Sequence, residues 1–416
     1  MNSGGYTINR SVNTHVAGWR TPAVVLACGS MVLMLSVGTR QSFGLFLQPM
    51  TLDLGWTRET FSFAIAVQNI VWGLGQPFAG AIADKFGAAR VIVAGGIFYA
   101  FGLALMAYST TGLAFDLSAG ILVGLGLSGS GFAVVMGVVG RAAAPAKRSA
   151  ALGLVGAGGS FGQFVMLPFG QALISHFGWL SALLVLAATS LVIIPLAAAL
   201  AGRNTAAQTS SQSLSAAIHE AAAHKGFWFL TVSFLVCGFQ TIFIMIHLPA
   251  YLVDQGMSPT QGMTALALIG FFNIVGSYGC GLLGGHYSKK NLLVWLYCIR
   301  AVAITLFIAL PLSTFTIWGF GITMGITWLG TVPLTNGLVA QIFGVKYLST
   351  LFSIVFLGHQ VGSFLGAWYG GLMFDLTGSY TTVWIFCVVL SVVAAALCVP
   401  VDERDVTLLR PVESKA

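Results

Sequence analysis

The sequence predicts an all-α membrane protein whose twelve transmembrane helices form two six-helix bundles related by pseudo-symmetry. Of its 416 residues, 57% are hydrophobic and 7% are charged, whereas a soluble domain carries about a quarter charged residues. The apolar residues also come in runs of twenty or more, as a hydrocarbon core of about 30 Å requires. Finally, the two halves of the chain resemble each other at an offset of about 200 residues, which indicates an internal repeat.

Breaks rich in Gly, Pro, charge or Asn and Ser divide the apolar stretches into twelve segments long enough to cross a bilayer. The segments cover residues 21–49, 60–83, 90–109, 112–140, 149–174, 179–201, 227–252, 261–284, 291–311, 314–341, 348–374 and 381–401. One long polar stretch suits a flexible or amphipathic linker. The predicted parts are a tail (1–20), a bundle (21–202), the linker (203–226), a second bundle (227–402) and a tail (403–416).

Basic residues gather on one side of the predicted membrane. With the N-terminus inside, the cytoplasmic segments hold Arg10, Arg20, Lys85, Arg90, Arg141, Lys147, Arg148, Arg203, Lys225, Lys289, Lys290, Lys346, Arg404, Arg410 and Lys415. Only Arg58 falls outside. Lys and Arg are retained on the cytoplasmic side during insertion, so both termini and the linker are expected in the cytoplasm. The membrane itself is expected to be the inner (plasma) membrane of the cell. The net charge of +7 is then a topology signal, and no nucleic-acid partner is implied.

The sequence shows no reactive constellation. Its six cysteines lie inside apolar runs, without CxxC spacing or a nearby histidine pair of zinc type, and are interpreted as packing residues. HExxH, GxSxG and paired intramembrane carboxylates are missing as well. We therefore expect no catalytic residue, metal or cofactor, and a membrane-embedded enzyme is disfavoured.

The internal repeat is clearest in two loops at equivalent places. Gly80–Arg90 (GAIADKFGAAR) follows the second predicted helix, and Gly281–Lys290 (GLLGGHYSKK) follows the eighth. Repeats of this size favour two bundles that face a shared cavity.

The first of these loops resembles the signature loop of the major facilitator superfamily, and the resemblance covers essentially the whole chain. Gly80, Asp84, Lys85, Gly87 and Arg90 match its glycine, acidic and basic positions. The resemblance implies transport by rocking of the two bundles. An acidic helix end and nearby basic residues can form a charge pair across neighbouring helices that is made and broken during this motion. The alternative is a loop that only sets topology.

A narrower resemblance lies at the start of the fifth predicted helix. Residues 147–162 (KRSAALGLVGAGGSFG) are similar to the monocarboxylate and oxalate:formate carrier branch, and their small residues at four-residue spacing also permit close helix packing. Residues 273–283 (NIVGSYGCGLL) depart from the branch. They lack its arginine in helix eight, and Asn273 stands where an acidic partner is sometimes found.

The ionisable residues predicted at membrane depth are all basic. An ionisable group inside a membrane helix costs about 3 kcal/mol on insertion scales and is a functional candidate by default. The four candidates are Arg40, His247, Arg300 and His359. A basic cavity favours a bound anion, and a guanidinium can hold a carboxylate through two parallel hydrogen bonds. An organic cation would be repelled.

Each of the four has a structural alternative. His359 aligns with a lysine of the oxalate carriers that the chain resembles, so it is the preferred substrate contact or proton carrier, since histidine titrates near neutral pH; the alternative is a neutral interhelical hydrogen bond. Arg300 either binds the anion or satisfies backbone carbonyls, Arg40 either lines the cavity or snorkels outward, and His247 can pair with Asp254.

Neutral polar side chains supply further candidates. Gln68, Asn69, Gln240 and Gln360 fall at mid-helix, where an unsatisfied amide is costly. Each is either a substrate contact or a hydrogen bond between helices.

These observations predict a monomeric secondary transporter that moves a small organic anion, foremost a monocarboxylate, by alternating access. Proton symport and anion exchange are both open. The rival is an efflux carrier for hydrophobic drugs, which the apolar composition permits and the basic centre disfavours.

Overall fold

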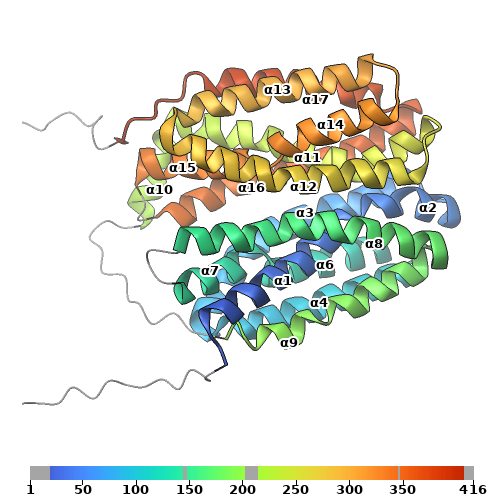
Figure 1. The fold of residues 1–416 in the computed structure, drawn as a ribbon, viewed down its shortest axis with the longest axis horizontal. Helices are drawn as coiled ribbons and strands as arrows, with labels where there is room; N and C mark the ends of the chain where they lie inside the picture. The colour runs from blue at the N-terminus through green and yellow to red at the C-terminus, as the bar shows by residue number, and fades with distance from the viewer. Residues whose placement is uncertain (1–18, 144–147, 202–213, 345–346, 407–416) are drawn as a thin grey trace, which may run out of the picture.

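The computed structural model describes residues 19–143, 148–201, 214–344 and 347–406, and within these ranges it consists of helices and connecting turns, without strands. The helices lie side by side in two groups, which Figure 1 shows as a blue-to-green set and a yellow-to-red set. Six of the predicted cytoplasmic basic residues lie outside the described residues, namely Arg10, Lys147, Arg203, Lys346, Arg410 and Lys415.

The first group holds the N-terminal half. Its elements are α1 (Pro22–Gln41), α2 (Gly44–Leu54), α3 (Arg58–Phe86), α4 (Ala88–Tyr108), α5 (Gly112–Phe115), the π-helix η1 (Asp116–Leu122), α6 (Val123–Ser130), α7 (Phe132–Ala142), α8 (Arg148–Ser190) and α9 (Ile193–Ala197). The first predicted span is therefore interrupted between Gln41 and Gly44, and the fourth is interrupted at Gly131.

The second group holds the C-terminal half. Its elements are α11 (Lys225–Asp254), α12 (Pro259–His286), α13 (Lys289–Ala309), α14 (Thr314–Thr327), α15 (Thr331–Phe343), α16 (Leu348–Thr377) and α17 (Thr381–Cys398). The short helix α10 (Leu214–Ala223) precedes it and lies within the predicted linker, whose last two residues belong to α11.

The helices make twelve crossings. Ten stretches of the described residues are long and apolar enough to span a membrane, and one of them, Ala151–Ala197, has 47 residues. Gly178 interrupts this stretch with a left-handed φ of 78°, so it crosses twice, in agreement with the separate fifth and sixth predicted helices. The twelfth crossing is α3, whose 29 residues carry charged and amide side chains that lower its hydropathy. The predicted fold class is confirmed.

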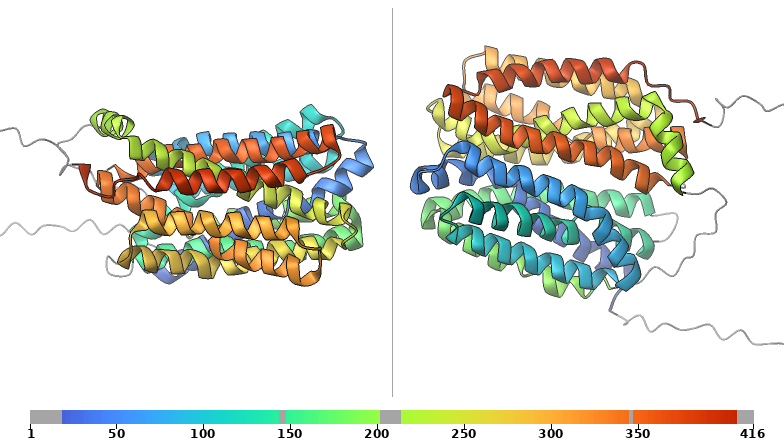
Figure 2. Two further views of the ribbon diagram at one scale, coloured as in Figure 1. Left: turned by 90° about the horizontal axis from the view of Figure 1, so that it is seen from above. Right: turned by 180° about the vertical axis from the view of Figure 1, so that it is seen from behind.

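The two ends of the molecule differ in what they carry. α1 begins and α17 ends at one end, beside α10, which we call the terminal end (Figure 1). The turns after α2, α4, α11, α13 and α16 lie at the other, which we call the far end. Figure 2 shows the same arrangement from above and from behind.

Equivalent hydrogen bonds repeat in the two bundles. Tyr99 donates to the carbonyl oxygen of Ser36 at 2.8 Å, and Tyr297 donates to that of Ser233 at 2.6 Å. The acceptors are 197 residues apart and the donors 198. The repeated contacts support the pseudo-symmetry of the bundles.

The same offset relates two bonds that cross between the bundles. Gln163 of α8 donates to the carbonyl oxygen of Leu266 at 3.0 Å, and Gln360 of α16 donates to that of Asn69 at 3.0 Å. The interface between the bundles accordingly pairs α3 with α16 and α8 with α12.

Candidate functional site

Arg40 lies at the interface of the bundles, in the last turn of α1. Its side chain is 3% exposed. Nε donates to Gln68 Oε1 at 3.1 Å and Nη2 donates to Asn69 Oδ1 at 2.5 Å. Among the described residues, the one hydrogen-bond contact of Nη1 is with the sulfur of Met245, 4.0 Å away on the opposite bundle, and Cζ is 5.0 Å from the centre of the Trp72 ring.

The charge of Arg40 has no carboxylate partner in the part of the chain that the structure describes. Among the described residues, the three salt bridges involve other arginines. The amide oxygens of Gln68 and Asn69 satisfy two of the guanidinium nitrogens without neutralising the group. A thioether is a weak acceptor, so Nη1 retains the capacity to bind an anion.

Asn69 connects Arg40 to two predicted residues of the other bundle. Gln360 Nε2 donates to the Asn69 carbonyl oxygen at 3.0 Å, and Gln360 Oε1 lies 3.1 Å from His359 Nδ1. Because an amide oxygen only accepts, this contact places the imidazole proton on Nδ1. His359 is 7% exposed and stacks on Phe356, with ring centres 5.7 Å apart. Four predicted residues, Arg40, Asn69, Gln360 and His359, therefore form one hydrogen-bonded chain.

Arg300 and Gln240 lie apart from this chain, inside the second bundle. Arg300 is fully buried, and its Nη2 donates to the carbonyl oxygens of Thr327 and Trp328, where α14 ends before α15. Its Nη1 lies 3.4 Å from Gln240 Oε1, and Gln240 Nε2 donates to Cys387 O at 2.8 Å. These contacts support the structural alternative for Arg300, because Nη2 is directed to two backbone carbonyls. Its Nε is buried without a partner among the described residues.

One alternative from the sequence was that His247 pairs with Asp254. The structure shows other partners for His247. Its Nδ1 lies 3.0 Å from the Tyr380 hydroxyl, and its Nε2 lies 2.9 Å from the carbonyl oxygen of Ala367. Asp254 is seven residues further along α11, roughly 10 Å by the helical rise, and binds another group.

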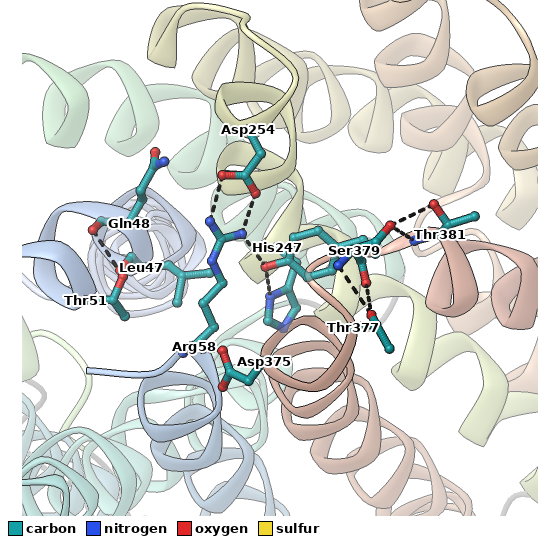
Figure 3. A network of polar contacts seen from close by, with 11 residues as sticks. Leu47, Gln48, Thr51, Arg58, His247, Asp254, Asp375, Thr377, Ser379 and Thr381 are labelled. Carbon is teal, nitrogen blue, oxygen red and sulfur yellow. Dashed lines mark hydrogen bonds and ion pairs between the residues drawn. The ribbon is translucent and has the colours of Figure 1, made fainter. Parts of the chain in front are cut away.

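That group is Arg58, at the start of α3 (Figure 3). Its two terminal nitrogens lie 2.6 and 2.7 Å from the Asp254 carboxylate oxygens, and Nη1 also donates to the Tyr380 hydroxyl at 2.9 Å. The guanidinium covers the Phe374 ring at 3.7 Å. Arg58 thus joins the first bundle to α11, α16 and α17 of the second at the far end.

A second carboxylate of the second bundle binds the first turn of α3. Asp375 accepts hydrogen bonds from the backbone nitrogens of Arg58 and Glu59 at 3.1 and 2.7 Å. A carboxylate at a helix N-terminus satisfies free N–H groups and complements the helix dipole. We call Arg58, Asp254, Asp375 and Tyr380 the far-end cluster. Sequence reasoning missed it, although a single basic residue on an acidic face was a usable signal.

The signature loop lies at the terminal end. α3 ends at Phe86, and Gly87 follows with a φ of 100° that favours glycine. Asp84 pairs with Arg141 of α7 at 3.1 Å, whereas Lys85 Nζ lies 5.2 Å from the centre of the Phe86 ring. The charge pair therefore joins neighbouring helices of the same bundle, through Arg141, which was expected only to set the topology.

Gly80 and Arg90 complete the predicted loop. A Cβ added at Gly80 would meet nothing within 4 Å, and Arg90 is exposed. The described residues therefore leave free space beside both positions.

Comparison with known proteins places the chain among transporters. The family model described as "Major Facilitator Superfamily" matches residues 26–338. Monocarboxylate transporter 13 of Rattus norvegicus is 26% identical over 375 residues, which cover 88% of this chain and 85% of the relative. The uncharacterized MFS-type transporter YcxA of Bacillus subtilis (strain 168) is 25% identical over 370 residues, with coverage of 84% and 88%.

A solved structure shares the fold. A bacterial homologue of the human lysosomal transporter Spinster, in an inward-facing and unoccupied conformation, superposes with a TM-score of 0.73 at 15% identity. The match covers 91% of this chain and 96% of that one.

Proposed function

The chain belongs to the Major Facilitator Superfamily, and from this premise we propose that it moves a small organic anion, foremost a monocarboxylate, by alternating access. The observation that carries the proposal is Arg40. It is a buried cation between the two bundles, without a carboxylate partner among the described residues, and its Nη1 faces a sulfur. An unpaired charge at membrane depth is costly, and a bound carboxylate would neutralise it.

The surroundings of Arg40 suit a carboxylate. Gln68 and Asn69 hold Nε and Nη2 and so fix the plane of the guanidinium, leaving Nη1 to approach the ligand. A buried hydrogen bond to a charged group is stronger than one between neutral groups. Relatives named monocarboxylate transporters support the same substrate class.

His359 is proposed to respond to the proton. It is linked to Arg40 through Gln360 and Asn69, so a change in its charge acts on the anion site through two amides. This hydrogen-bonded chain of residues is compatible with proton symport and with anion exchange.

The orientation follows from the charges. Of the described basic residues outside the membrane, Arg58 alone is at the far end, beside Asp254 and Asp375. Lys and Arg are retained on the cytoplasmic side of the plasma membrane during insertion. The terminal end therefore faces the cytoplasm. The far-end cluster then closes the carrier to the outside in this conformation.

Uptake into proteoliposomes tests the proposal. Radiolabelled carboxylates, neutral solutes and organic cations are offered to wild type, to Arg40→Gln and to Arg404→Gln, a surface variant with the same charge change. We expect wild type to take up a carboxylate and Arg40→Gln to lose about ten- to a hundredfold in affinity, the value of a charged hydrogen-bond contact. Arg404→Gln should behave as wild type. Uptake of a cation or hydrophobic drug that Arg40→Gln leaves intact would contradict the proposal.

A further inference from the structure

His247 is a buried histidine whose two ring nitrogens both have partners in this conformation. The side chain is fully buried, and the ring packs on the backbone of α16, where a Cβ added to Gly370 would come within 2.5 Å of Nε2. Nε2 lies 2.9 Å from the carbonyl oxygen of Ala367, and a carbonyl oxygen only accepts a hydrogen bond. The proton of the neutral ring is therefore on Nε2, and Nδ1 is an acceptor.

Tyr380 connects this ring to Arg58, which lies beside it in Figure 3. Because Nδ1 accepts, the Tyr380 hydroxyl donates to it, at 3.0 Å. The same hydroxyl oxygen accepts a hydrogen bond from Arg58 Nη1 at 2.9 Å. The hydrogen bonds thus run in one direction, from the guanidinium through the hydroxyl and the imidazole to the carbonyl oxygen. A neutral His247 therefore holds the far-end cluster together from below.

A second proton on His247 is incompatible with this arrangement. It turns Nδ1 into a donor, so the Tyr380 oxygen then faces a donor on each side. The hydroxyl has no third partner among the described residues to which it could donate. The imidazolium also carries the same charge as Arg58, in a buried place where like charges repel strongly. Protonation of His247 therefore weakens the contacts that keep the far end closed.

Other charged and titratable groups surround the ring. They are Tyr251 and Asp254 on α11, Arg58 and Glu59 at the start of α3, Asp375 on α16 and Tyr380 at the start of α17. Asp254 is paired with Arg58, and Asp375 accepts from backbone nitrogens. The guanidinium is therefore the one charge in the hydrogen-bonded chain of His247, and the carboxylates have partners of their own.

The far-end cluster separates His247 from the far-end surface. Asp254 is seven residues further along α11, roughly 10 Å by the helical rise, and its side chain is 23% exposed. The fully buried ring of His247 becomes accessible from this side once the cluster has parted. Opening of the far end thus removes the repulsion from Arg58 and admits a proton in the same step.

We propose that His247 is a proton-binding site that controls the far-end cluster. The closed conformation holds the ring neutral, and a proton bound from the far-end side stabilises the open conformation. A ligand that binds one conformation better shifts the population toward it, so acid favours opening. The inference rests on the proposed function in one respect, which is that the far end opens during alternating access. It is separate from the role proposed for His359, which acts on the anion site.

Spin-label distances test the site without any substrate. Labels on cysteines at Thr111 and Ser313, one at the far end of each bundle in a background without native cysteines, report the ratio of open to closed carriers in nanodiscs from pH 5.5 to 8. His247→Gln keeps an amide donor and acceptor but cannot become charged. His176→Gln is the matched control, because His176 is exposed where α8 turns at the far end. Should His247→Gln fail to fold, His247→Asn keeps an acceptor near the place of Nδ1.

We expect the open-to-closed ratio of wild type to rise by about tenfold between pH 8 and pH 5.5, since one linked proton shifts an equilibrium by at most about tenfold per pH unit. His247→Gln should keep the wild-type ratio of pH 8 throughout, and His176→Gln should respond as wild type does. A wild type without the response overturns the proton site. A His247→Gln variant that still responds also overturns it, because the response then comes from Asp254, Asp375 or another group.

The two proposals fail in different experiments. Label distances that do not depend on pH leave the proposed anion transport intact, because uptake of a carboxylate is measured separately. A wild type that takes up no carboxylate overturns the proposed function, whereas a pH response that His247→Gln abolishes would still establish the proton site.

Discussion

Two buried arginines carry the same charge in different surroundings. Arg40 donates to the side chains of Gln68 and Asn69 at the interface between the bundles, where the proposed rocking of the bundles would change its neighbours. Arg300 donates to backbone carbonyls of its own bundle, which move with it. The first arrangement suits a binding group, and the second suits a group that stabilises the end of α14.

Replacing Arg300 should therefore reduce stability rather than affinity. Arg300→Gln leaves the carbonyl oxygens of Thr327 and Trp328 without their donor, and a buried unsatisfied acceptor costs about 1–3 kcal/mol. We expect the unfolding temperature in detergent to fall by roughly 2–8 °C, with substrate affinity per folded carrier close to wild type. A stable Arg300→Gln carrier that has lost affinity would instead assign Arg300 to the substrate.

His359 should make affinity depend on pH. Gln at this position keeps hydrogen bonding to Gln360 but cannot become charged, whereas an imidazole can bind a second proton. If imidazolium supports anion binding, His359→Gln should lose affinity mainly at acidic pH and resemble wild type at alkaline pH. Uptake measured from pH 5 to 8 checks this. A loss that is equal at every pH would assign His359 to packing.

At the scale of helices, the far-end cluster binds one bundle to the other through the start of α3. Arg58 reaches Asp254 and Tyr380, and Asp375 receives two backbone N–H groups. All three partners belong to the second bundle, so every one of these contacts must break when the far end opens. The cluster consequently stabilises the conformation observed here.

Breaking the cluster should open the far end. Arg58→Gln removes the contact with Asp254, and we expect the population closed at the far end to fall about tenfold relative to the open one. Spin labels on cysteines at Thr111 and Ser313, one on each bundle in a background without native cysteines, measure the separation. Arg404→Gln is the control, because its partner Asp402 is in the same bundle.

Reversing the charges sharpens the test. Arg58→Asp combined with Asp254→Arg should recover part of the closed population. If Arg58→Gln leaves the label distances unchanged, the cluster does not hold the bundles together.

Sequence patterns identified the helices better than their interruptions. Runs of apolar residues mark a crossing whatever its internal geometry, so residues 112–140 were predicted as one helix, although the backbone is extended at Gly131. Glycine is frequent in membrane helices, and hydropathy does not show which one interrupts a helix. The far-end cluster escaped prediction for a related reason, because Arg58 and Asp254 are brought together only by the packing of α3 against the second bundle.

At the scale of the whole molecule, the repeat made the architecture predictable. Because the second bundle repeats the first after 197 residues, equivalent contacts occur in both, as Tyr99 with Ser36 and Tyr297 with Ser233 show. Similarity between two loops was therefore enough to predict two bundles. The site is different, because it arises where the repeats diverge. Arg40 has Cys237 as its counterpart at the same offset, and no rule of the repeat predicts which copy carries the charge.

The orientation of the whole molecule is open to a direct test that uses residues from both ends. Ser211 belongs to the predicted linker, outside the described residues, and the distribution of Lys and Arg predicts that it lies in the cytoplasm. Ser313 lies at the far end, between α13 and α14, where it caps α14. In a background without native cysteines, an impermeant maleimide applied to intact cells should label a cysteine at Ser313 and spare one at Ser211 until the membrane is opened. The reverse pattern would invert the carrier and turn the far-end cluster toward the cytoplasm.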